Sequence, residues 1–172
     1  MRERFRFKAG ALENLREGGQ FKRIIDELGI SKKIEFVRSN LSIIIIMPDY
    51  KIKIMNNHWE TINYLQDLFP SESRKIYNFF DYLLNTDFIT LYSQTKNKIF
   101  SQFLEDYFSD KKLKAIIKAL VAQIGVPSEK MLVLTVAIHL REFIFDSGYY
   151  PLGGLQRFSE AFADILKNLV EN

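Results

Sequence analysis

Gly148-Tyr149-Tyr150-Pro151-Leu152-Gly153-Gly154 stands directly before an amphipathic run that continues to Asn172. Glycine and proline at this density predict a rigid turn in which the backbone closely approaches another group. The apolar residues of the run recur at helical spacing: Leu155, Phe158, Phe162, Ile165, Leu166 and Leu169. The segment therefore predicts a tight turn that opens a helix, although spacing alone is equally typical of an ordinary loop before a helix.

Helical periodicity dominates the chain after residue 56. Asp110 and Gly125 are expected to begin and end one helix, Ser71 to cap another, and Pro127 to occupy the first turn of a third. One earlier helix is expected over residues 19–28. The later ones are expected over residues 57–68, 71–94, 98–108, 110–124, 128–145 and 155–170.

Isoleucine-rich runs at 34–37, 42–47 and 51–55 are too short for helices and predict strands. The Pro48-Asp49-Tyr50 turn joins the last two into a hairpin. Lysine and isoleucine alternate from residue 51, which indicates a half-buried strand, whereas Ile43-Ile44-Ile45-Ile46 does not alternate and is expected to be covered on both faces. A bare face there would favour association between copies.

The predicted fold is one α+β domain over residues 1–172, with a small, mainly antiparallel sheet beside a predominantly helical region. Helix and strands are mixed over 1–56, and residues 57–172 are helical. The chain contains 47% hydrophobic and 14% aromatic residues, enough for a sizeable core. It has no cysteine, which excludes disulfides and thiolate chemistry. With no secretory signal and no apolar run long enough to span a bilayer, we expect a cytoplasmic protein.

The sequence lacks the motifs that are typical of hydrolases and metalloenzymes. His58 and His139 are the only histidines, neither belongs to an H-E-x-x-H motif, and no serine lies in G-x-S-x-G. The carboxylate pair Glu105 and Asp106, like Glu142 and Asp146, has the spacing of a solvated helix face. We therefore expect no metal site and assign no catalytic residue.

The net charge of +3 is too small and too evenly spread to indicate nucleic-acid binding. The densest basic group, Lys111, Lys112, Lys114 and Lys118, is expected to form the solvated face of a helix. Contact with an anionic membrane surface is the functional alternative for these lysines.

Aromatic residues are abundant in the helical part, where they either fill a core or line a long apolar pocket for an isoprenoid chain. These residues are Phe79, Phe80, Tyr82, Phe88, Tyr92, Phe100, Phe103, Tyr107, Phe108, Phe143 and Phe145. The spacing does not separate the two interpretations.

Several short motifs occur in an order that resembles one enzyme family. Gly18-Gly19 with a helix and Gly29-Ile30, then Phe69-Pro70, then Gly125-Val126-Pro127, precede a segment similar to G-x-x-Y-P-x-G-G. In this order they resemble the phytoene desaturase and carotenoid isomerase group of FAD-dependent oxidoreductases. The resemblance covers residues 7–172 and corresponds to the substrate-side insertion of such an enzyme. Tyr50 departs from the pattern, because this family often has glycine at the end of that turn.

The resemblance implies that the helical part roofs a substrate tunnel above a flavin. It also places Tyr149, Tyr150, Pro151, Gly153 and Gly154 near flavin and substrate, where they position rather than transfer protons. The G-x-G-x-x-G fingerprint of a dinucleotide-binding domain is absent from the sequence, so FAD is expected to belong to the complete enzyme and not to this chain alone.

The expected function is therefore substrate binding in an oxidoreductase that acts on an isoprenoid or other apolar small molecule, with no activity in isolation. The alternative is a non-enzymatic helical module that binds a lipid or a partner protein. Self-association into a homo-oligomer is expected if the chain is a substrate-side segment that lacks its flavin domain, and a strictly monomeric chain would instead favour a self-contained module. Peripheral membrane contact is a further option for a partner, and nucleic-acid binding is not expected.

Overall fold

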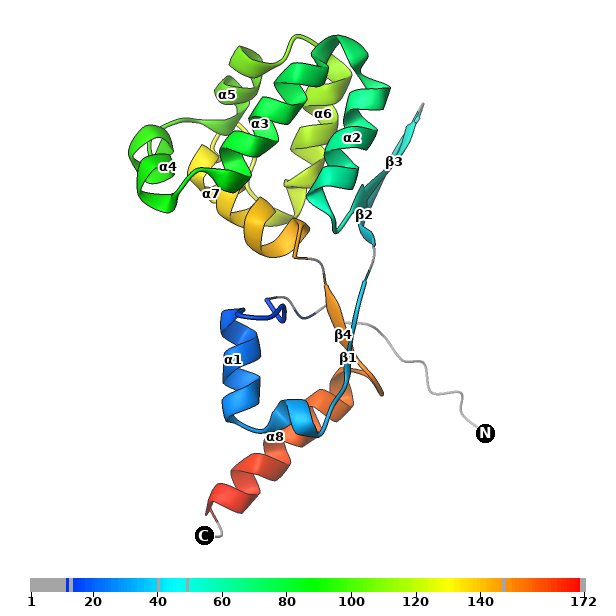
Figure 1. The fold of residues 1–172 in the computed structure, drawn as a ribbon, viewed down its shortest axis with the longest axis vertical. Coiled ribbons are helices and arrows are strands. Elements are labelled where there is room, and N and C mark those ends of the chain that lie inside the picture. The colour runs from blue at the N-terminus through cyan, green and yellow to red at the C-terminus, as the bar shows by residue number, and fades with distance from the viewer. Residues whose placement is uncertain (1–11, 13, 40, 49, 147, 171–172) are drawn as a thin grey trace. The chain divides into compact units, whose positions relative to one another are not determined.

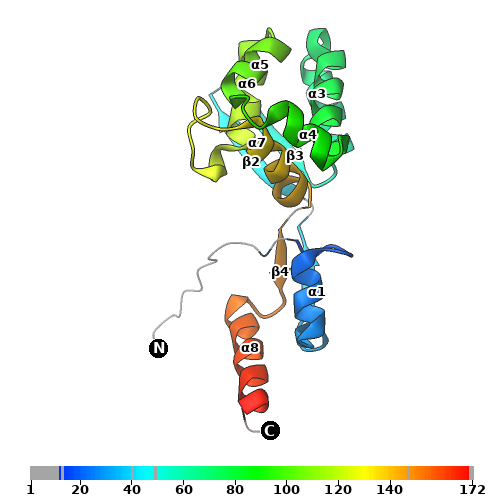
Figure 2. The ribbon, with the colours of Figure 1, turned by 90° about the vertical axis from the view of Figure 1, so that its left-hand side faces the viewer.

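The computed structural model describes residue 12 and residues 14–39, 41–48, 50–146 and 148–170 (Figures 1 and 2). The fold is α+β, as the sequence predicts: helices predominate, and the strands form small antiparallel sheets. Close contacts divide the chain into two compact units, where a single domain is expected from the sequence. We call Met1–Ser39 with Ser147–Asn172 the terminal unit, and Asn40–Asp146 the helical unit.

The terminal unit is built from the two ends of the chain. Strand β1 (Phe36–Arg38) pairs antiparallel with β4 (Tyr149–Pro151), so that Val37 lies opposite Tyr150. The helices of this unit are α1 (Gln20–Glu27), the 3-10 turn η1 (Ile30–Lys32) and α8 (Leu155–Val170). They enclose a small apolar core whose buried members are Leu15, Ile25, Ile30, Ile34, Tyr149 and Ala161.

The helical unit begins with the hairpin β2 (Leu41–Met47) and β3 (Tyr50–Met55). Asn57, Asp87 and Asp110 then begin helices by accepting backbone N–H bonds through their side chains, because the first N–H groups of a helix have no internal partner. The helices are α2 (His58–Leu68), α3 (Ser73–Asn85), α4 (Phe88–Thr95), α5 (Phe100–Tyr107), α6 (Lys111–Leu120) and α7 (Val133–His139). Shorter turns are η2 (Pro70–Glu72), η3 (Ala122–Ile124) and the π-helical η4 (Leu140–Ile144).

Most of the aromatic side chains fill the core of the helical unit. The ring of Phe79 lies 5.3 Å from that of Phe80 and 5.2 Å from that of Phe108, measured between centroids. The buried aromatics are Phe69, Phe79, Phe80, Phe100, Phe103, Phe108 and Phe145. Phe88 and Tyr92 are exposed, and the side chain of Phe143 lies outside the described part.

The predicted hairpin is confirmed, but the prediction that β2 is covered on both faces is wrong. Ile45 is buried, whereas Ile44 is 45% and Ile46 is 77% exposed. The register explains this difference: Ile44 and Ile46 lie opposite Lys53 and Lys51 on one face of a two-stranded sheet, and only the other face packs against helices.

The predicted bounds of two long helices are also wrong. The helix expected over residues 71–94 breaks at Thr86, whose extended backbone lets Asp87 begin α4. Ser71 is part of the 3-10 turn η2 and caps no helix. The helix expected over residues 128–145 begins only at Val133, because residues 128–132 run alongside residues 98–101, where Phe100 donates its N–H to Met131 O at 2.7 Å. Pro127 therefore lies in a turn before this segment.

No helix within the described ranges is both long and apolar enough to cross a membrane.

The break between α3 and α4 is held by Arg141, from η4. Its Nε donates to the carbonyl oxygen of Leu83 at 2.7 Å, and its Nη2 donates to that of Thr86 at 2.6 Å. We predict that Arg141→Met lowers the free energy of unfolding by about 1–3 kcal/mol, because two partly buried carbonyl groups lose their charged donor. Urea denaturation measures this change. Arg74→Met, which replaces an exposed arginine of α3, should leave the midpoint unchanged, and equal midpoints for wild type and Arg141→Met would contradict the prediction.

Candidate functional site

Residues 148–154, which the resemblance places at the site, form a strand, a turn and a helix start. Tyr149 exchanges two backbone hydrogen bonds with Leu12, at 2.7 and 2.9 Å, and its strand pairs with β1 on the other side. Leu152 N–H donates to Glu35 O at 2.8 Å just beyond the ladder. The segment is thus fixed on both sides by other parts of the terminal unit.

Strand alternation separates the two tyrosines. The side chain of Tyr149 is buried in the small core, with the guanidinium of Arg38 5.9 Å from the ring centroid. Tyr150 points to the other face and is 37% exposed, and Leu152 is 44% exposed. Only Tyr150 and Leu152 therefore present side chains that a ligand can reach, while Tyr149 and Pro151 anchor the segment.

The turn itself depends on two successive glycines. Gly153 and Gly154 have φ values of 91° and 93°, a region that L-residues rarely adopt. Gly154 N–H donates to Pro151 O at 2.9 Å, which closes the turn. A Cβ on Gly153 would lie 2.8 Å from Cδ of Arg157, and one on Gly154 would lie 3.6 Å from Oη of Tyr150. The sequence correctly predicts a tight turn, and the close approach is to these side chains of the same unit.

The helix start of α1 does not fit the pyrophosphate of FAD. Gly18 and Gly19 directly precede Gln20, the first residue of α1, so that this helix also begins after paired glycines. A Cβ on Gly19 would lie 2.4 Å from the carbonyl oxygen of Asn14, and Asn14 Oδ1 accepts the N–H of Gln20 at 3.1 Å. This helix start is closed by its own chain, so it offers no cradle for a phosphate.

Neither histidine has the surroundings of a metal ligand or a general base. His58 packs against the rings of Trp59 and Phe145, and burial lowers its pKa. His139 is half-buried with Nε2 2.9 Å from Nε2 of Gln123, and burial likewise lowers its pKa. Among the residues that the structure describes, no group of three or more histidine, aspartate or glutamate side chains could hold a metal ion.

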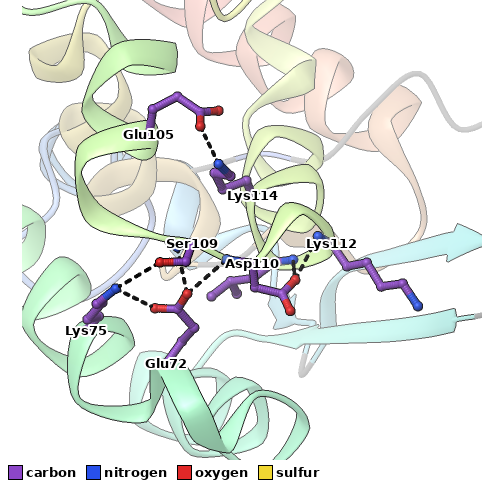
Figure 3. Close-up of polar contacts among 8 residues, drawn as sticks. Glu72, Lys75, Glu105, Ser109, Asp110, Lys112 and Lys114 are labelled. Carbon is purple, nitrogen blue, oxygen red and sulfur yellow. Dashed lines mark hydrogen bonds and ion pairs between the residues drawn. The ribbon is translucent and has the colours of Figure 1, made fainter.

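A buried carboxylate, Glu72, was not singled out by the sequence analysis and is the centre of a polar cluster in the helical unit (Figure 3). Its Oε1 accepts the N–H groups of Ser109 at 2.7 Å and Asp110 at 2.9 Å, and its Oε2 lies 3.0 Å from Nζ of Lys75. Asp110 in turn caps α6, and Lys114 pairs with Glu105 at the edge of the same cluster. The contacts of Glu72 join η2 to the segment before α6, and the Lys114–Glu105 pair joins α6 to α5, so these contacts hold elements of the helical unit together.

The pKa of Glu72 reflects these contacts. Burial by itself raises the pKa, but the ion pair with Lys75 and the N–H groups of Asp110 and Ser109 outweigh burial and bring the pKa below its ordinary value of 4.5. A carboxylate with a lowered pKa stabilises the fold above its unfolded-state pKa, and this contribution disappears as the pH falls through the folded-state value.

Two open depressions in the helical unit have polar walls. One of about 490 Å³ lies beside α2 and α3 and is lined by Asn63, Gln66, Asp67, Pro70 and Ser73. Another of about 410 Å³ is lined mainly by Asn97, Lys98, Gln102, Asp106 and Tyr107. Their amide and charged walls do not suit a long apolar chain.

Comparison with known proteins gives no match: no family model, curated protein or solved structure is significantly similar to this chain.

We predict that Gly153→Val lowers the free energy of unfolding by about 1–3 kcal/mol, because valine is strained at positive φ and its Cβ meets Arg157. Urea denaturation of the two proteins gives the value. Leu152→Val changes the neighbouring exposed residue and serves as the control. An unchanged midpoint for Gly153→Val would show that the glycine is not required by the fold.

We also predict that Glu72→Gln destabilises the protein by about 1–3 kcal/mol at pH 7, since the buried acceptor loses its charge. The difference from wild type should shrink as the pH falls below 4.5, where the wild-type carboxylate also becomes protonated. Urea midpoints measured across this pH range test both statements. Glu27→Gln, at an exposed position of α1, is the control, and a pH-independent difference would refute the ionic role.

Proposed function

We propose that this chain is the substrate-side segment of a phytoene desaturase-like FAD-dependent oxidoreductase that acts on an isoprenoid or other apolar substrate. The flavin would be held by a dinucleotide-binding domain outside these 172 residues, because the sequence contains no G-x-G-x-x-G fingerprint. The observation that carries the proposal is the segment Tyr149–Gly154, where a strand, two glycines at positive φ and a helix follow one another in the order of the family's motif.

Asn40–Asp146 is one continuous insertion between β1 and β4, which pair with each other in the terminal unit. The resemblance assigns residues 7–172, and therefore residues of both units, to the substrate-side part of such an enzyme.

The proposed roles of the residues follow from their exposure. Tyr150 and Leu152 would contact the apolar substrate, since their side chains are accessible, while Tyr149 and Pro151 would hold the strand in place from within the core. Gly153 and Gly154 would let the backbone turn sharply beside the substrate. A bound flavin supplies the redox chemistry, and these residues would contribute orientation and the exclusion of water.

The flavin content of the chain and of its native assembly tests this proposal. The purified chain, mixed with FAD and desalted, should be colourless, and the assembly isolated from its own cells should contain about one flavin per chain. In that assembly, Tyr150→Ala should lower kcat/KM for a polyene substrate roughly tenfold without loss of flavin. Tyr77→Ala, at a tyrosine that is 41% exposed in the helical unit, is the matched control.

An assembly without flavin would refute the proposed enzyme and favour the non-enzymatic binding module. Flavin retained by the chain alone at unit stoichiometry would refute the location of the cofactor site.

A further inference from the structure

Helix α4 carries its apolar side chains on the side that faces solvent. Its buried residues are Leu91 and Thr95, whereas Phe88 is 55%, Ile89 is 79% and Tyr92 is 46% exposed. A helix at the surface of a globular unit normally shows the opposite distribution, with its larger apolar residues in the core. The packing of α4 within the helical unit therefore leaves three large apolar side chains in contact with solvent.

The exposed side chains form one continuous surface. Phe88 and Tyr92 are one helical turn apart, with near-parallel rings whose centroids are 6.4 Å apart, and Nζ of Lys96 lies 5.5 Å from the Tyr92 centroid. Figure 1 shows α4 at the left margin of the helical unit. We call Phe88, Ile89, Tyr92 and Lys96 the α4 face.

The size of the α4 face argues against a protein partner. Burying an aromatic side chain completely removes only about 150–250 Å² of surface from solvent. The exposed parts of the three apolar side chains of the α4 face therefore add up to roughly 300 Å². A stable protein–protein interface needs about 800 Å² on each partner. A lipid bilayer has no such requirement, since a few inserted side chains at the headgroup level already contribute to binding.

The charge beside the α4 face suits an anionic lipid surface. Lys96 follows the aromatic residues, and a lysine can extend along an apolar surface to place its ammonium group among phosphates. The nearest carboxylate along the chain, Asp87, accepts the N–H of Thr90 at 3.0 Å and so is already engaged as the cap of α4. Aromatic residues beside lysine are typical of membrane interfaces.

We propose that the α4 face inserts into the interface of a phospholipid bilayer, with Phe88, Ile89 and Tyr92 at the acyl boundary and Lys96 at the anionic headgroups. The inference rests on α4 alone and does not depend on a flavin. It assigns membrane contact to α4 rather than to the lysines of α6, of which Lys114 is buried and paired with Glu105.

Flotation of the purified chain with phosphatidylcholine vesicles, with and without phosphatidylglycerol, tests the proposal. The wild-type chain should float with the vesicles, more strongly when phosphatidylglycerol is present. Ile89→Ser should lower the bound fraction roughly fivefold to tenfold, and Ile46→Ser should not, although isoleucine is 79% exposed at one position and 77% at the other. Lys96→Ala should weaken binding about fivefold on the anionic vesicles only.

Fluorescence locates the contact independently of the amount bound. In a Trp59→Phe background, Ile89→Trp should shift its emission to shorter wavelength when vesicles are added, and Ile46→Trp should not. The proposal fails if the wild-type chain does not float, or if Ile46→Ser loses as much binding as Ile89→Ser. It also fails if sedimentation shows a dimer that Ile89→Ser dissociates, because a second copy would then cover this face.

Discussion

The antiparallel pairing of β1 with β4 is the interaction on which the rest of the terminal unit depends. It joins segments that lie far apart in the sequence, and Leu12 adds an isolated bridge to Tyr149 on the opposite side of β4. The pleat of this strand then decides which residues are anchors and which are accessible: Tyr149 enters the core, and Tyr150 faces out. The end of β4 fixes where the glycine turn and the start of α8 lie.

The helical unit uses its polar groups mainly to satisfy helix ends. Glu72 binds backbone N–H groups before α6, Asp110 caps α6 itself, and Arg141 binds carbonyl groups at the end of α3. A buried charge is costly unless it is paired or hydrogen-bonded, and in each case the partners include a helix terminus that has free donors or acceptors. Seven aromatic side chains among the described residues of this unit are buried in its core, whereas Trp59, Tyr77 and the aromatic residues of α4 are exposed.

The sequence predicts local features of this fold well and long-range ones poorly. The hairpin, the Asp110 cap and the glycine turn were predictable because each depends on residues within one short segment. The break at Thr86 was not, since the arginine that holds it comes from η4, far along the chain. The role of Glu72 could not be predicted for the same reason, because the backbone N–H groups that it binds are 37 and 38 residues away.

The candidate site shows the same limit. The positive φ of Gly153 and Gly154 follows from the local Pro-Leu-Gly-Gly sequence, but the burial of Tyr149 depends on residues at both ends of the chain. The exposure of Ile44 and Ile46 was mispredicted because a run of isoleucines does not reveal how many layers pack against a strand. Periodicity predicted helical structure for residues 88–94, but as part of one long helix, and it did not predict that apolar side chains there would face outward.

The terminal unit is discontinuous in sequence, and this determines the order in which the two units can fold during synthesis. A ribosome makes β1 before the helical unit and makes β4 only after it, so β1 has no strand partner while the intervening residues emerge. The helical unit is continuous in sequence and can form its core as soon as its last helix is available. The terminal unit therefore closes last, and until then the apolar faces of α1 and β1 remain open to chaperones and to other nascent chains.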